Sequence, residues 1–293
     1  QQTQAWKFNV AVGDSLLRGS RPDAFGTGRV RIQQRQLTFD FDEKPQFPFE
    51  EAQAANEILD KGYHVVVGNP PYITMKDKAQ NEAYRQHFRQ VCHRKFSLGV
   101  PFTQRFWELA IRPGERINPD SEQTSPAAGY VGIITANSFM KREFGKKLIE
   151  DFFPKSDLTH VLDTSGAYIP GHGTPTVILF GRARKPVDVT VRAVLGIKGE
   201  PSTPEDPSQG KVWQSIIGQI DNSNSQDEFT STADIPRTSL SSHPWSIGGG
   251  GIADLVELLE ENAVNTLVDA VDVVGIFGMT NADEVFLADY KSF

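Results

Sequence analysis

Residues 65–72 read Val-Val-Val-Gly-Asn-Pro-Pro-Tyr, and this stretch decides the fold class of the chain. An apolar run of β-branched residues that ends abruptly in a turn is typical of a buried strand in a parallel sheet. In an α/β protein with such a sheet, ligands bind just beyond the carboxyl ends of the strands. The sequence therefore predicts an α/β fold in which the turn at 69–72 carries the chemistry.

The turn offers the groups that hold a planar amine. The side chain of Asn69 supplies an amide oxygen, and Pro70 and Pro71 fix the backbone while leaving their carbonyls as acceptors. Tyr72 adds a flat aromatic face. Two acceptors and a stacking surface can bind a heterocycle by its exocyclic amino group. The alternative is that Asn-Pro-Pro is only a stiff loop after a strand.

Further strand and helix patterns alternate along the chain. Strands are predicted at 8–13, 129–135, 158–162 and 176–180, and helices at 50–59, 77–94, 102–111 and about 139–153. This alternation predicts a largely parallel sheet. Because only Thr164 to Pro175 separate the last two strands, we expect that pair to be antiparallel.

The composition limits the class of protein. With 293 residues, of which 38% are hydrophobic, the chain can bury the core of one large domain and part of another. No apolar run is long enough to span a bilayer, and residues 1–7 lack the features of a signal peptide, so no membrane partner is expected. The single cysteine, Cys92, excludes an intrachain disulfide and a cysteine zinc cluster, which fits a reducing cytoplasm. No metal site is predicted.

The charge argues against indiscriminate binding of nucleic acids. The formal net charge is −7, whereas the neutralisation of phosphates usually requires a basic surface. Basic residues are enriched locally, at 141–147 and at 182–185. Each group is either part of a DNA-facing cleft or ordinary solvated surface, and the sequence leaves both open.

The turn and its strand resemble the N6-adenine DNA methyltransferases that carry an Asn-Pro-Pro-Tyr motif. In that family the Asn side chain and the first Pro carbonyl accept hydrogen bonds from the target N6 amino group, and the Tyr stacks on a flipped adenine. The resemblance implies these roles for Asn69, Pro70 and Tyr72, with Pro71 shaping the turn. It also implies a Rossmann-like class I methyltransferase sheet with an antiparallel last strand, S-adenosylmethionine as cofactor and double-stranded DNA as partner.

Two residues are candidates for binding the cofactor. Asp14 directly follows the strand predicted at 8–13, where the family has an Asp that binds the adenine amino group of S-adenosylmethionine. The alternative is an N-cap of a turn beginning at Ser15, and one residue can do both. On the helix after the catalytic turn, Phe106 best matches a family Phe that lines the cofactor adenine, although a plain core aromatic is equally consistent. Pro101 replaces the acidic residue usual before this helix, which weakens the match.

The loop between the last two predicted strands supplies candidates for the second face of the target base. In the family an aromatic residue of this loop stacks there. Tyr168 is the nearest aromatic, although an alignment without gaps places Ile169 at the family position. His172 is an alternative contact for the DNA backbone, but its glycine neighbours indicate simple turn chemistry.

The domain organisation follows from composition and from the resemblance. Residues 1–198 are interpreted as a partial methyltransferase catalytic domain with an insertion at 18–60, which includes a hairpin. Residues 199–247, rich in Ser, Thr, Pro, Asp and Asn, are interpreted as a mobile linker with one short docked element near 212–220. Residues 248–293 contain a predicted helix and resemble the start of a target recognition domain.

No glycine-rich loop for the methionine part of the cofactor precedes Asp14, and the first residue is not Met. We therefore expect an internal segment of a longer protein, with the first strand and the cofactor loop upstream. The likeness at 68–78 and 173–180 is to PglX-type methyltransferases of bacteriophage exclusion systems, which implies marking of host DNA and association with other phage-defence proteins. The alternatives are a protein-glutamine or RNA amino-methyltransferase, or a non-catalytic DNA-docking segment.

Overall fold

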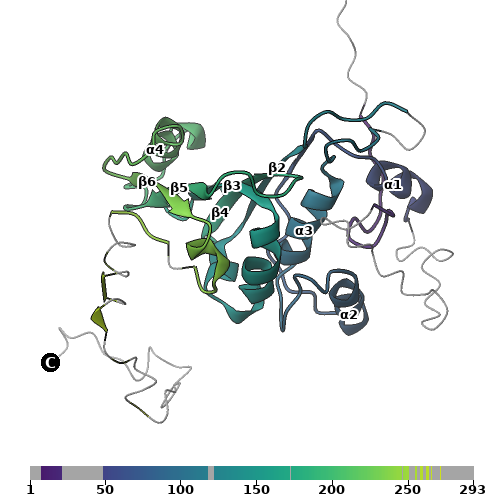
Figure 1. Ribbon diagram of the computed structural model, residues 1–293, viewed down its shortest axis with the longest axis horizontal. Coiled ribbons are helices and arrows are strands. Elements are labelled where there is room, and N and C mark those ends of the chain that lie inside the picture. Colours follow the sequence, from purple (N-terminus) through teal and green to yellow (C-terminus); the bar gives the residue numbers. More distant parts are fainter. Residues whose placement is uncertain are drawn as a thin grey trace, which may run out of the picture. The chain divides into compact units, whose positions relative to one another are not determined.

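The computed structural model describes residues 8–21, 49–117, 122–171, 173–245 and 247–250, and isolated positions between 255 and 271. Residues 1–251 form one compact unit and residues 252–293 a second. All the elements below lie in the first unit (Figure 1). The hairpin predicted within the insertion, the helix after 251, the start of a recognition domain and His172 fall outside the described residues.

A six-stranded mixed sheet, in the order β1-β2-β4-β3-β5-β6, forms the centre of the unit. The strands are β1 (Val65–Gly68), β2 (Tyr130–Ala136), β3 (Asp157–Asp163), β4 (Thr176–Arg182), β5 (Thr190–Gly196) and β6 (Thr230–Pro236). The predicted antiparallel pairing of β3 with β4 is confirmed. The prediction of a largely parallel sheet was wrong. Among these six described strands, only β1 with β2 and β3 with β5 run parallel. The other neighbouring strands are antiparallel, and of these only β3 and β4 are joined by a short connection.

The described residues form four α-helices: α1 (Ala52–Leu59), α2 (Lys78–His87), α3 (Gly99–Leu109) and α4 (Lys211–Gln219). The first three confirm the helices predicted at 50–59, 77–94 and 102–111, although α2 ends at His87 because Phe88 leaves the helical conformation. Short 3₁₀ or π turns occur at Asn137–Met140, Glu143–Gly145, Leu148–Phe152, Phe153–Lys155, Pro207–Gln209 and Ser239–Ser241. The single helix predicted to about 153 was therefore wrong. A Cβ on Gly145 would lie 1.8 Å from the Phe139 carbonyl oxygen, so the chain folds back too tightly there for a continuous helix.

The two faces of the sheet differ in their cover. One face packs against α3 and the turns at 137–155, and its core includes Trp107, Ile133 and Phe152. On the other face, α4 covers the region of β3 and β5, where Leu162 and Val194 are buried. The prediction that residues 65–68 form a buried strand was wrong, because β1 lies at the edge of the sheet and its Val65 and Val67 are exposed.

Residues 8–13, predicted as a strand, form none. A strand needs a neighbour that completes its ladder of hydrogen bonds, and no described strand pairs with this stretch. Backbone contacts to Glu51 hold it instead: the Val12 N–H donates to Glu51 Oε2 (2.9 Å), and the Glu51 N–H donates to the Val12 carbonyl (2.7 Å).

The interpretation of residues 199–247 as a linker is also corrected. This stretch contains α4, which confirms the docked element near 212–220, and it contains β6, which pairs with β5 along its whole length. The sheet therefore continues past the boundary set at residue 198. Within the described ranges, none of the helices has the length and the apolar character needed to cross a membrane.

Candidate active site

The turn at 69–72 and the loop that carries Tyr168 and Ile169 lie at the same edge of the sheet. Strands β1 and β2 are parallel and β4 is antiparallel to both β2 and β3, so the carboxyl ends of β1, β2 and β3 and the start of β4 share this edge. The turn at 69–72 follows β1, Asn137 follows β2 and the loop with Tyr168 and Ile169 follows β3. The Asn137 N–H donates to the Pro175 carbonyl (3.0 Å), which joins the end of β2 to that loop.

The turn at 69–72 is partly exposed. Asn69 and Pro71 are exposed, Pro70 is buried and Tyr72 is half-buried. Burial raises the pKa of the Tyr72 phenol above its ordinary value, so the side chain stays neutral under physiological conditions. Just after the turn, the Ile73 carbonyl accepts a hydrogen bond from the Leu98 N–H (2.8 Å) at the start of α3. The turn is thus fixed to α3, while the amide of Asn69 faces the solvent.

Helix α3 brings Phe106 to the catalytic turn. A Cβ on Gly68 would lie 2.9 Å from Phe106 Cζ, so the ring lies directly against the residue that precedes Asn69. Phe106 is half-buried and makes an edge-to-face contact with Phe102, with 6.4 Å between the ring centroids. Phe106 also packs against the core. Its position is therefore consistent with both roles considered from the sequence, a core aromatic and a wall of a ligand site.

Asp14 caps the turn that follows it. Its Oδ1 accepts hydrogen bonds from the Leu16 N–H (2.9 Å) and the Leu17 N–H (3.1 Å), and its Oδ2 accepts one from the Tyr84 hydroxyl (2.7 Å). The capping role is confirmed. Burial, together with the Asp14 carboxylate, raises the pKa of Tyr84, which therefore remains a donor. Binding of the cofactor by Asp14 stays a prediction.

The Asp14 turn and the catalytic turn pack on the same helix. Arg105 of α3 donates from Nε to the Ser15 carbonyl (2.9 Å), while its neighbour Phe106 lies against β1. Arg105 is buried and also pairs with Glu108 (3.3 Å from Nη1 to Oε2). Because adjacent residues of α3 contact both turns, the helix fixes the position of the Asp14 turn relative to the turn at 69–72. Sequence reasoning missed Arg105, although a charged residue within an apolar helix was a signal.

Tyr168 and Ile169 are both half-buried in the loop between β3 and β4. The loop is closed at its base by a hydrogen bond between the Thr164 and Thr176 hydroxyls (2.7 Å) and is held further along by the Glu200 N–H, which donates to the Gly166 carbonyl (2.9 Å). Strands β4 and β1 are two strands apart in the sheet, roughly 10 Å. Stacking on Tyr168 or Ile169 stays a prediction.

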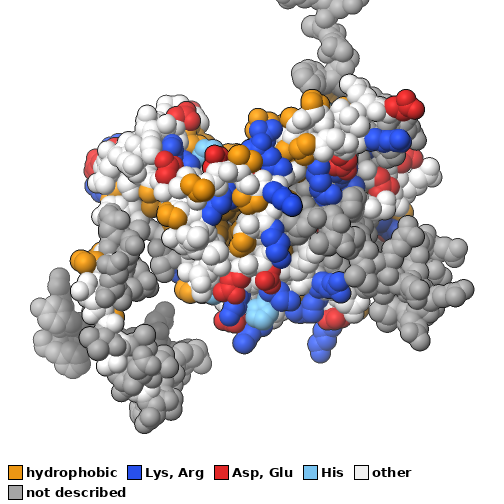
Figure 2. All heavy atoms as spheres, viewed as in Figure 1, with side chains coloured by type: hydrophobic (Ala, Val, Ile, Leu, Met, Phe, Trp, Pro, Cys, Tyr) orange, Lys and Arg blue, Asp and Glu red, His pale blue; other side chains and the backbone are white. Residues whose placement is uncertain are grey.

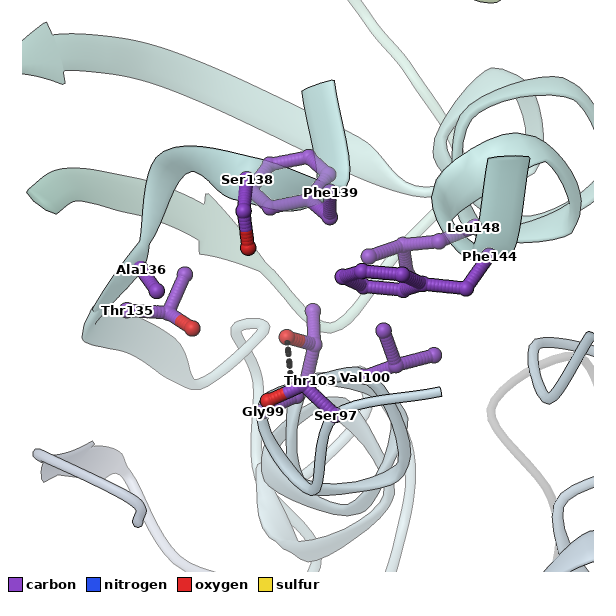
Figure 3. A pocket seen from close by; sticks show the side chains of 10 residues that line it. All are labelled: Ser97, Gly99, Val100, Thr103, Thr135, Ala136, Ser138, Phe139, Phe144 and Leu148. Carbon is purple, nitrogen blue, oxygen red and sulfur yellow. Dashed lines mark hydrogen bonds between the residues drawn. The ribbon is translucent and has the colours of Figure 1, made fainter. Parts of the chain in front are cut away.

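A small cavity lies between the start of α3 and the end of β2 (Figure 3). Its volume of about 10 Å³ suits a single water molecule at most. Thr103 Oγ1 donates to the Gly99 carbonyl (2.7 Å) there, and Thr135 and Ser138 face it from the strand side. A Cβ on Gly99 would lie 2.5 Å from Thr135 Oγ1, so only glycine allows α3 to approach β2 this closely. This approach, which the sequence did not reveal, sets the position of α3 and hence of Phe106.

In the described ranges, no group of three or more His, Cys, Asp or Glu side chains is arranged to hold a metal ion.

Comparison with known proteins gives matches to DNA methyltransferases. Residues 20–117 match the family described as Eco57I restriction-modification methylase. The adenine-specific methyltransferase PglX of Streptomyces coelicolor is 44% identical, over 98% of this chain and 23% of that protein. The type II methyltransferase M.PaeR7I of Pseudomonas aeruginosa is 23% identical, over 80% of this chain and 37% of that protein. Each curated relative is thus much longer than the region it shares with this chain.

Among solved structures, the type IIG restriction endonuclease BpuSI is similar, with 14% identity and a TM-score of 0.44, over 78% of this chain and 26% of that chain.

Proposed function

We propose that this chain, a homologue of an adenine-specific methyltransferase, forms part of the catalytic module of an enzyme that methylates N6 of an adenine flipped out of double-stranded DNA. The observation that carries the proposal is the turn at 69–72, which exposes Asn69 at the carboxyl edge of the sheet, with Phe106 against the preceding Gly68. In this reading the enzyme acts in restriction-modification or in phage defence, together with other defence proteins.

The turn can orient the amino group of the base. Asn69 Oδ1 and the Pro70 carbonyl are the two acceptors, and the prolines provide no N–H that would compete for them. When both N6 hydrogens are bound to these acceptors, the amino group would be held in place and its nitrogen lone pair would stay free to accept a methyl group. Tyr72 holds the ring by stacking, and Tyr168 or Ile169 covers its second face.

The residues present fit the adenine end of S-adenosylmethionine. Phe106 offers a half-buried aromatic face beside Gly68. The buried Asp14 carboxylate accepts three short hydrogen bonds and a longer one from Gln80 Nε2 (3.4 Å), and the amino group of the cofactor adenine would take the place of Gln80. The bound cofactor supplies an electrophilic methyl group on sulfur. Groups for its methionine end are expected upstream of residue 1, together with the first strand of the sheet, so we propose that the 293-residue chain alone binds the cofactor weakly or not at all.

The proposal is tested with the full-length protein and S-adenosylmethionine labelled in its methyl group. Duplex DNA, single-stranded RNA and a glutamine-containing peptide are offered as acceptors, and the products are hydrolysed and identified by mass spectrometry. We expect label in DNA as N6-methyladenine. If label appears only in the peptide or only in the RNA, DNA is not the substrate, and the protein is the corresponding protein-glutamine or RNA amino-methyltransferase.

A further inference from the structure

One face of the sheet is uncovered over β1, β2 and β4. Side chains alternate between the faces of a strand, and the register places Val67 beside Gly132 and Gly132 beside Phe180. Val67 is 70% exposed, and Tyr130 on the same face is 55% exposed. Hydrophobic side chains lie beside Lys and Arg side chains over the part of the molecule where Figure 1 places β2 and β4 (Figure 2).

This uncovered region is a hollow of about 820 Å³. Sheets built with parallel strand pairs and crossover helices normally have both faces covered, because each face presents apolar side chains. The opposite face of these strands follows that rule, since Val131 and Ile133 are buried under the core. An open face with exposed valines and a tyrosine therefore marks an interaction surface.

The same face shows what kind of element covers it. Further along the sheet, the amphipathic helix α4 lies on β3 and β5, and its Val212 and Ile216 bury Leu162 and Val194. The hollow continues from α4, where Ile220 lines it, to β1. A second helix beside α4 would complete the layer.

Three of the four arginines that line the hollow, Arg184, Arg192 and Arg237, form ion pairs with aspartates. Arg192 is bound to Asp234 (2.6 Å) and Arg237 to Asp157 (2.9 Å). The Arg182 guanidinium stacks on Tyr130, 4.1 Å from its ring centroid, and donates from Nη2 to the Ala128 carbonyl (2.7 Å). Its Nε is buried and has no acceptor among the described residues. A buried donor of this kind is satisfied by an acceptor from whatever packs on the face.

We propose that a helix from the part of the full-length protein that precedes residue 1 packs on this face. It would place apolar residues on Val67 and Phe180 and an Asp or Glu side chain at Arg182 Nε. The chain spans only 23% of its PglX relative, so a longer polypeptide has sequence to supply the helix. The preceding part is favoured because residues 8–13, its continuation, also leave apolar side chains uncovered: Phe8 and Val10 are more than four-fifths exposed.

Thiol labelling tests whether the face is covered. In the full-length protein, the variants Val67→Cys and Ile217→Cys are labelled with a maleimide, and the modified peptides are quantified by mass spectrometry against the urea-unfolded protein. Ile217, on α4, is the matched control because it too is an exposed aliphatic residue (52%). We expect position 67 to react at least about tenfold more slowly than position 217. Equal rates would show that the face is open and overturn the proposal.

Photocrosslinking then identifies the occupant. With p-benzoylphenylalanine in place of Tyr130 in the full-length protein, we expect crosslinks to a peptide that precedes residue 1. Crosslinks to a later segment, or to a second copy of the protein in mixed isotope-labelled samples, would overturn the assignment. Wild-type hydrogen exchange gives a check without substitution, because β1 amides should exchange slowly under the proposed cover. None of these outcomes depends on methyl transfer, so they leave the proposed function to its own test.

Discussion

Strands β1 and β2 lie side by side, run in the same direction and each lead into an asparagine, but their surroundings differ. β2 is inside the sheet, and its Ile133 is completely buried, whereas β1 lies at the edge with exposed valines. After β1, Asn69 is exposed. After β2, Asn137 is half-buried, and its N–H is bound to the Pro175 carbonyl. The comparison indicates that β2 stabilises the fold, and in our proposal β1 presents the chemistry.

The largest expected effect separates the two asparagines. In the full-length protein, Asn69→Ala should lower the rate of methyl transfer by about 10²–10³-fold, because the lost acceptor acts mainly in the transition state. DNA binding, measured by fluorescence anisotropy, should change little. The matched control Asn137→Ala should keep most of the activity, since its backbone contact survives the substitution. Similar losses in both variants would contradict the division between the strands.

The next largest effect distinguishes β2 from β1 by how much each contributes to the free energy of unfolding. Ile133→Ala should lower the free energy of unfolding of the 293-residue chain by about 2–5 kcal/mol, because it opens a cavity in the core. Val67→Ala should cost less than about 1 kcal/mol, since its side chain is mostly in solvent. Urea unfolding followed by circular dichroism measures both. In the full-length protein, Val67→Ala should lower the free energy of unfolding by more than this if a helix covers Val67. An equally small loss in the full-length protein would weaken the proposal that a helix packs on this face.

A smaller effect concerns the aromatic at the end of the β1 turn. Tyr72→Ala should lower activity by roughly 5- to 150-fold, the equivalent of about 1–3 kcal/mol of base stacking. Tyr72→Phe and Tyr72→Trp should retain most activity, because stacking requires only an aromatic face. Methylation rates of the three variants decide the matter. Equal losses in all three would mean that the hydroxyl is required and that stacking is the wrong account.

The smallest effect lies away from both strand ends, at Asp14. Asp14→Ala should destabilise the chain by about 0.5–2 kcal/mol through loss of the cap. In the full-length protein it should also weaken binding of S-adenosylmethionine without changing the methylated DNA sequence. Asp14→Asn, which keeps an oxygen for the cap, separates the two roles: calorimetry should still show weaker cofactor binding. Unchanged affinity in both variants would leave Asp14 with a capping role only.

Local patterns predicted single elements and close pairings better than they predicted the order of the sheet. The strand and turn at 65–72 and the antiparallel pair of β3 and β4 follow from adjacent residues and a short connection. The edge position of β1 depends on which strands lie beside it, so its exposed valines could not be read from an apolar run. For the same reason residues 8–13, which have a strand pattern, form no strand in the absence of a described neighbour.

Strand β6 shows a second limit. Its sequence, Thr-Ser-Thr-Ala-Asp-Ile-Pro, is too polar to indicate a strand, yet it pairs with β5 and its Asp234 binds Arg192. That pairing joins residues far apart in the chain. The close approach of Gly99 to Thr135 is likewise a contact between distant residues, so sequence reasoning found Phe106 but not what positions it.

Photocrosslinking of the target base tests the central claim most directly. Once the methylated adenine has been mapped, a duplex with 5-iodouracil at that position is bound to the full-length protein, irradiated, and the crosslinked peptide sequenced by mass spectrometry. If the base lies on the turn after β1, the crosslink should be at Tyr72 and should disappear in Tyr72→Ala. A crosslink at Tyr130 on the open face, or at any residue away from the carboxyl edge of the sheet, would contradict the account.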